Sequence, residues 1–88
     1  MREGTTKSGF KFKIDERRLD DMEFMELLAS VDEEPLKLPE LIETMLGAEQ
    51  KKKLYDHLRT KDGRVPIQKT TDIVGEIMNI AGEDTKNS

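Results

Sequence analysis

The stretch that decides the fold reads Leu54-Tyr55-Asp56-His57-Leu58-Arg59-Thr60-Lys61-Asp62-Gly63-Arg64-Val65-Pro66-Ile67. Leu54, Tyr55 and Leu58 have the spacing of the apolar face of one helix. Gly63 accepts the left-handed backbone that closes a helix, and Pro66 suits the first turn of the next one. The stretch therefore predicts a corner between two amphipathic helices, of the kind found in small interaction domains.

Upstream of this corner the chain predicts two more helices. Asp20 is a suitable N-cap, with Glu23 at the spacing of a capping box and Leu19 and Phe24 at the spacing of a hydrophobic staple. This helix is expected to run to about Val31, with a core stripe of Phe24, Leu27, Leu28 and Val31. Pro35 ends it, and Pro39 suits the first turn of a shorter helix that Gly47 ends. The apolar positions of the shorter helix are Leu38, Leu41, Ile42, Met45 and Leu46.

Downstream of the corner, Pro66 opens a fourth helix that is expected to end at Gly82. Its core stripe consists of Val74, Ile77, Met78 and Ala81. The polar residues 83–88 are expected to form a flexible C-terminal tail.

The N-terminal region carries a strand signal. Phe10, Phe12 and Ile14 alternate with polar residues, which places them on one face of a strand over residues 9–15. A lone strand cannot satisfy its backbone groups, so these residues are candidates for strand pairing. The partner is either residues 4–7, through a hairpin turned at Ser8-Gly9, or a strand of a second chain. Residues 1–8 are otherwise polar and small and are expected to be flexible.

We therefore predict a mainly α fold: one domain over residues 9–82, built as a small bundle of about four short helices with an N-terminal β-strand or hairpin. A chain of 88 residues allows one domain at most. With 34% hydrophobic and 39% charged residues, its core is expected to be thin.

Composition excludes several classes of function. The absence of cysteine rules out disulfides and thiolate metal sites, and no apolar run reaches the roughly 20 residues of a membrane span. Residues 1–13 lack the continuous apolar stretch of a signal peptide, so a cytoplasmic location is expected. The net charge of −4 disfavours nucleic-acid binding and favours solubility.

No residue pattern predicts an enzyme, a metal or a cofactor. His57 is the single histidine and has no companion ligand nearby, so it is interpreted as an ordinary helix residue. The carboxylates between Asp20 and Glu26 fit the first turn of a helix better than a calcium loop. The lysines at positions 51–53 fan around a helix instead of forming one patch. The glycines match no phosphate-binding loop.

Surplus apolar residues are the more informative feature. Met22, Met25 and Ala29 form a second stripe on the first helix, and Ile73 and Ile80 extend the core set of the fourth. Either these helices are central and fully packed, or the surplus faces a partner groove or a second copy. Methionine adapts to different partners, which favours an interface. The candidate protein-binding residues are Met22, Met25, Met45, Ile73 and Ile80.

The stretch from Lys53 to Pro66 resembles tail assembly chaperones of long-tailed phages and prophages of Gram-positive bacteria. Three further segments are similar to that family in the same order, so the resemblance covers roughly residues 6–67. They are Thr6-Lys7-Ser8-Gly9-Phe10, Leu19-Asp20-Asp21-Met22-Glu23 and Met45-Leu46-Gly47. The chain after Thr71 has no counterpart in the resemblance.

The resemblance implies a non-enzymatic protein without cofactors. Such a chaperone binds the tape measure protein in the host cytoplasm, keeps it soluble, recruits tail tube subunits and is absent from the mature virion. The chain would correspond to the short form of a pair whose longer form arises by frameshifting. A second hypothesis, from a different class, is a protein-interaction adaptor or regulatory module that dimerises through its N-terminal strand.

Overall fold

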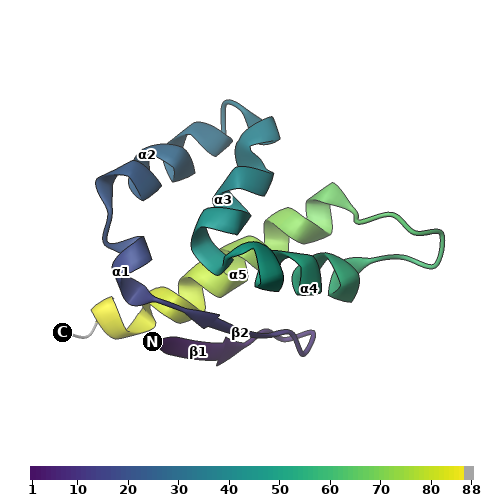
Figure 1. The fold of residues 1–88 in the computed structure, drawn as a ribbon, viewed down its shortest axis with the longest axis horizontal. Coiled ribbons are helices and arrows are strands. Elements are labelled where there is room, and N and C mark those ends of the chain that lie inside the picture. Colours follow the sequence, from purple (N-terminus) through teal and green to yellow (C-terminus); the bar gives the residue numbers. More distant parts are fainter. Residues whose placement is uncertain (87–88) are drawn as a thin grey trace.

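A computed structural model describes the backbone of residues 1–86 and the side chains of residues 1–82. An N-terminal hairpin precedes a set of short helices and one long C-terminal helix (Figure 1). This arrangement confirms the predicted mainly α fold with an N-terminal hairpin. The elements are β1 Arg2–Thr5, β2 Lys11–Ile14, α1 Glu16–Leu19, α2 Met22–Val31, the 3₁₀ turn η1 Pro35–Lys37, α3 Leu38–Leu46, α4 Ala48–Leu58 and α5 Ile67–Lys86.

The hairpin is closed by backbone hydrogen bonds within the chain. Strands β1 and β2 pair antiparallel, with Gly4 opposite Phe12 and Arg2 opposite Ile14. In the turn, the Thr6 amide donates to the Phe10 carbonyl at 2.9 Å, and the Phe10 amide donates to the Thr6 hydroxyl at 3.1 Å. The segment over residues 1–8, which was predicted to be flexible, thus contains strand β1, whose backbone pairs with β2.

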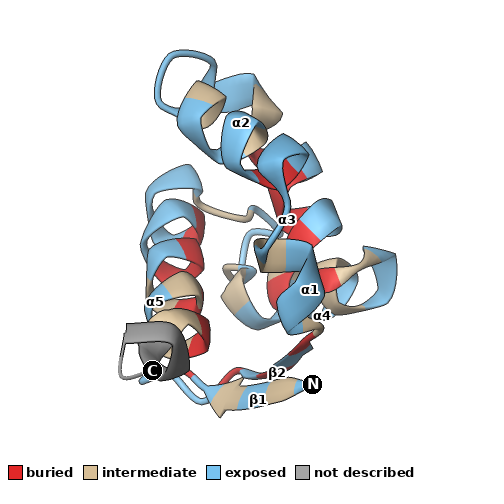
Figure 2. Cartoon of the chain, turned by 90° about the vertical axis from the view of Figure 1, so that its left-hand side faces the viewer, coloured by how far each residue is buried: buried red, intermediate tan, exposed pale blue. Residues whose placement is uncertain are grey.

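Helix α3 lies at the centre of the core. All five of its predicted apolar residues are buried, and Ile42 and Met45 are completely covered. The hairpin covers one end of the core, where the Phe10, Phe12 and Ile14 side chains are also buried, as the alternation predicted. Burying each large apolar side chain contributes roughly 1.5–3 kcal/mol, so these residues supply most of the driving force for folding. In Figure 2 the buried positions lie on the sides of the helices that face one another.

Helix α5, near the C-terminus, packs against the N-terminal hairpin. It packs beside β1, where the Arg2 guanidinium donates to the Ile80 carbonyl at 3.3 Å. Nearer the hairpin turn, the Lys7 amide donates to the Glu76 carboxylate at 2.6 Å. The first and last elements of the sequence are therefore in contact with each other (Figure 1).

The structure corrects the predicted start of the first long helix. Helix α2 is capped by Asp21, whose carboxylate accepts from the Glu23 amide at 2.9 Å. Asp20 instead ends α1, a short helix that is capped by Asp15 and that the sequence pattern did not predict. Because the N-cap is Asp21, Leu19 is not the residue directly before it, and the predicted hydrophobic staple between Leu19 and Phe24 is placed one position too early.

The predicted ends of the last two helices also differ from the structure. Helix α4 stops at Leu58, and Gly63, with φ of +89°, lies in the following turn, where its amide donates to the Thr60 carbonyl at 3.0 Å. Helix α5 passes Gly82 and continues to Lys86. The predicted flexible tail thus overlaps the helix at residues 83–86, and its last two positions, 87 and 88, lie outside the described residues.

Candidate protein-binding surface

An open apolar groove of about 650 Å³ lies between α1, α2 and the C-terminal half of α5. Helix α2 packs on η1 and α3 and projects from the rest of the molecule (Figures 1 and 2). This projection leaves the side of α2 that faces α5 without a covering helix. The apolar residues that line the groove are Leu19, Phe24, Met25, Leu28, Met78 and Ala81.

Helix α2 carries two apolar stripes, and the core covers one of them. Phe24 is buried, and Leu27 and Val31 pack against the core. On the other stripe, the exposed fractions are 66% for Met22 and 57% for Met25. Leu28, which was assigned to the core stripe, is 36% exposed and lines the groove, so that assignment is wrong.

The five predicted binding residues do not form one surface. Met22 and Met25 are exposed, as an interface requires, but Met45 is completely buried and Ile73 is 5% exposed. Met45 lies on α3, which is covered on several sides, and Ile73 faces the core from α5. Ile80 is half-buried and packs against the hairpin beside Gly4. Met45 and Ile73 are therefore corrected from binding candidates to core residues.

Besides Met25, the apolar groove residues that are not fully buried are Leu19, Leu28 and Met78, and the sequence reasoning missed all three. Leu28 lies three positions after Met25, so the helical spacing already placed the two on one stripe. Leu19 and Met78 had no such signal, because their contribution depends on how α1 and α5 are placed relative to α2. They could be recognised only from the three-dimensional arrangement.

The groove lies beside a strongly acidic segment. Residues 19–36 contain seven of the 19 acidic residues of the chain and none of its 15 basic residues. Asp20 itself lines the groove, and Glu26 follows Met25 on α2. Among the described side chains, the ion pairs that reach this segment are limited to Glu34 with Lys37, at 3.8 Å. Most of this negative charge is therefore not neutralised by ion pairs with the side chains of residues 1–82.

Two arginines, Arg2 and Arg17, line the groove, and both are engaged: the Arg2 guanidinium donates to the Ile80 carbonyl, and Arg17 forms an ion pair. Arg17 lines the groove, but its guanidinium binds the Asp15 carboxylate at 2.8 Å. Hydrogen bonds from the Arg17 side chain and then from its backbone amide lower the pKa of Asp15 to about 2. The Arg17 charge is thus largely compensated by its own neighbour.

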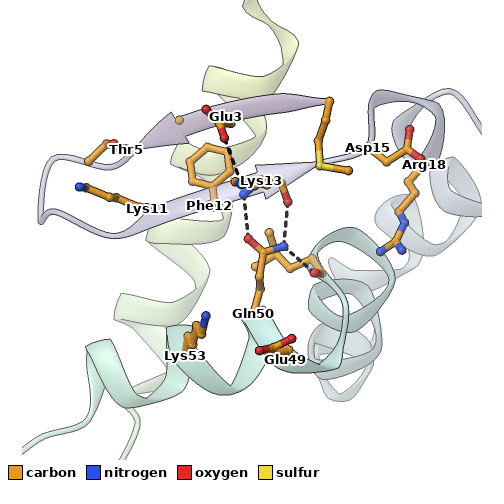
Figure 3. A pocket seen from close by; sticks show the side chains of 13 residues that line it. Glu3, Thr5, Lys11, Phe12, Lys13, Asp15, Arg18, Glu49, Gln50 and Lys53 are labelled. Carbon is orange, nitrogen blue, oxygen red and sulfur yellow. Dashed lines mark hydrogen bonds and ion pairs between the residues drawn. The ribbon is translucent and has the colours of Figure 1, made fainter.

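The strand-pairing candidates are used within the chain. Phe12 and Ile14 pair with β1, and Phe10 accepts a backbone hydrogen bond in the turn. On the other edge of β2, the Gln50 amide group donates to the Lys13 carbonyl at 2.7 Å and accepts from the Lys13 amide at 2.7 Å (Figure 3). Gln50 therefore binds β2 as the backbone of a third strand would.

A second hollow, of about 710 Å³, lies beside β2 and the start of α4 (Figure 3). Its wall is largely charged, with Glu3 and Lys13 paired across it at 3.3 Å and Lys11, Glu49 and Lys53 close by. The apolar groove beside α2 is thus the better candidate for contact with another polypeptide.

His57 supports the hairpin turn. Its Nε2 atom lies 2.9 Å from the Ser8 hydroxyl, and its ring lies 5.6 Å from that of Phe10. Within the described residues, no three His, Cys, Asp or Glu side chains are grouped to hold a metal ion. Over the same residues, no helix combines the length and apolarity needed to cross a membrane.

Comparison of the chain with protein-family models, with curated proteins and with solved structures finds no match. The features that bear on function are the apolar groove, its acidic border and the resemblance of residues 6–67 to the tail assembly chaperones.

Proposed function

We propose that the chain is a non-enzymatic phage tail assembly chaperone that binds the tape measure protein, keeps it soluble and recruits tail tube subunits. The observation that carries this proposal is the groove between α2 and α5, where Met25 and Leu28 are presented to solvent. In this proposal the chaperone acts in the host cytoplasm and leaves before the virion is complete.

The shape and chemistry of the groove support binding of a helical client. A tape measure protein is long and helical and exposes apolar stripes before the tail tube surrounds it. An amphipathic helix binds such a groove by inserting side chains at i, i+3, i+4 and i+7 spacing. The flexible Met25 and Met78 side chains can repack against successive segments of a long client. The acidic surface of α2 would keep the complex soluble.

The alternative is an adaptor that dimerises through residues 10–14. In the structure, β1 pairs with one edge of that strand, and the Gln50 side chain forms hydrogen bonds with the Lys13 backbone on the other edge. A second chain would have to displace one of these partners, so the groove gives the chaperone proposal stronger support.

Co-expression with the tape measure protein of the same genome tests the proposal. We expect the tape measure protein to become soluble and to co-purify with the chain, and tail tube protein to join the complex when it is added. A tape measure protein that stays insoluble and does not co-purify would refute the proposed function.

Matched variants locate the contact within this experiment. Met25→Glu places a charge in the groove and should weaken co-purification, whereas Ile67→Glu, at a 77% exposed position at the other end of α5, should not. Both variants should keep the far-ultraviolet circular dichroism of the parent, because both side chains are largely exposed. If Met25→Glu unfolds the domain, Met25 is a core residue and the assigned face is wrong.

A further inference from the structure

We infer that the groove between α2 and α5 binds a basic amphipathic helix of a different polypeptide. This inference deepens the proposed function, on which it depends for the biological client, by specifying the chemistry of the client segment. Its physical basis is the combination of an uncovered apolar stripe with a border of uncompensated carboxylates.

The apolar part of the groove calls for a helical ligand. Met25 and Leu28 are spaced by one helical turn on α2, and Met78 and Ala81 are spaced likewise on α5. Two such pairs on facing helices, with Leu19 beside them, form the walls that a third helix covers with a stripe of its own. A helix in this position would remove the exposed part of Met25 and Leu28 from water.

The charges around the groove specify the polar face of that helix. Asp20 lines the groove, and Glu26 lies next to the exposed methionine stripe. Neither carboxylate has an ion pair among the described residues, whereas the nearby Arg17 is bound to Asp15 and Arg2 donates to the Ile80 carbonyl. Lysine or arginine residues that flank the ligand's apolar stripe on the α2 side would therefore meet the negative charge of Asp20 and Glu26.

The same charges argue against other occupants. A two-fold dimer through this face would bring one acidic α2 close to another and place like charges together. An anionic membrane surface or a nucleic acid would be repelled in the same way. A polypeptide of opposite charge is the occupant that fits both the apolar and the electrostatic character of the groove.

Three synthetic peptides of about 18 residues, enough for five helical turns, test the inference against the full chain. One carries a leucine stripe flanked by lysines, the second carries the same stripe flanked by glutamates, and the third has the composition of the first with the stripe scrambled. We expect the first to bind, as followed by calorimetry, and the other two to bind at least roughly tenfold more weakly. Raising the salt from about 0.1 M to about 1 M shortens the Debye length from about 10 Å to about 3 Å. The affinity of the lysine-flanked peptide should therefore fall several-fold.

Variants of the chain assign the effect to the groove. The double variant Asp20→Lys with Glu26→Lys should weaken binding of the lysine peptide roughly tenfold and strengthen that of the glutamate peptide. The control Glu40→Lys with Glu49→Lys makes the same change in net charge on α3 and α4, outside the groove, and should leave both affinities nearly unchanged. Met25→Glu should also weaken binding of the lysine peptide, whereas Ile67→Glu should leave that binding unchanged.

The outcomes separate this inference from the proposed function. Equal binding of the lysine and glutamate peptides would overturn the inference, and so would equal effects of the two double variants. A dimer in a solution mass measurement that Met25→Glu abolishes would overturn it as well. If no peptide binds but the tape measure protein is still solubilised, the inference fails and the proposed function stands. If the lysine peptide binds selectively and the tape measure protein does not, the inference stands and the proposed function fails.

Discussion

Replacing Gly4 by alanine should destabilise the protein, although such a change in a strand is usually favourable. A Cβ atom at Gly4 would lie 2.6 Å from Cζ of Phe12 and 2.8 Å from Cγ2 of Ile80. Ordinary contacts between carbon atoms are about 3.5–4.0 Å, so the Phe12 ring would have to move by about 1 Å. That ring is 2% exposed and has little space to move into.

The expected magnitude follows from two opposing effects. Overpacking a buried site typically costs about 1–3 kcal/mol. Alanine also restricts the unfolded chain, which offsets about 0.4–1 kcal/mol of that cost. We therefore expect Gly4→Ala to lower the free energy of unfolding by about 1–2 kcal/mol, which corresponds to a fall in Tm of roughly 4–15 °C for a domain of this size.

Urea denaturation followed by far-ultraviolet circular dichroism measures the change. Gly75→Ala is the matched control, because Gly75 is exposed within α5 and a Cβ there would meet nothing within 4 Å. The control should raise the free energy of unfolding by about 0.5–1 kcal/mol. Phe12→Leu should relieve part of the clash, so the cost of Gly4→Ala should be smaller in that background. If Gly4→Ala were as stable as the parent while Gly75→Ala behaved as expected, the described packing of β1 against α5 would be refuted.

Three further predictions concern single side chains. Gln50→Ala removes the amide that binds β2 and should lower the free energy of unfolding by about 0.5–1.5 kcal/mol in the same urea assay, because water replaces the two exposed hydrogen bonds. Thr6→Val removes the buried hydroxyl that accepts from the Phe10 amide and should lower the free energy of unfolding by about 1 kcal/mol. An unchanged free energy of unfolding would show that the backbone hydrogen bonds alone hold the turn. The pKa of Asp15 is lowered to about 2, so its stabilising contribution is complete above pH 3.8 and is lost as the pH falls through about 2. Carboxyl-detected NMR should show this titration, and Arg17→Ala should return it toward 3.8; an unchanged pKa in that variant would exclude the ion pair as its cause.

The sequence predicted the elements whose apolar residues have one clear period. The apolar spacing in residues 38–46, with Gly47 at the end, gave α3 correctly, and the alternation at Phe10, Phe12 and Ile14 gave the buried face of β2. The predicted helix boundaries were wrong where two neighbouring residues were equally suitable as N-caps. Asp20 and Asp21 are both good caps, and the choice between them depends on α1, whose four residues are too few to show a period.

The binding face was harder to predict than the fold, for a physical reason. Met45 and Met25 are the same residue type on amphipathic helices, yet one is completely buried and the other is 57% exposed. The difference arises because α3 is surrounded by other elements whereas α2 projects from them. A single sequence shows how many apolar stripes a helix has, but not which of them another element covers.

The contact between β1 and α5 has a consequence for synthesis on the ribosome. The hairpin is made first, but its packing partner includes Ile80, which is made 76 residues after Gly4. At roughly 5–20 residues per second, translation of that interval takes several seconds, during which the phenylalanine side chains of the hairpin lack part of their cover. The domain can therefore complete its fold only after Ile80 has been synthesised, and a nascent chain halted midway would expose those aromatic rings to the cell.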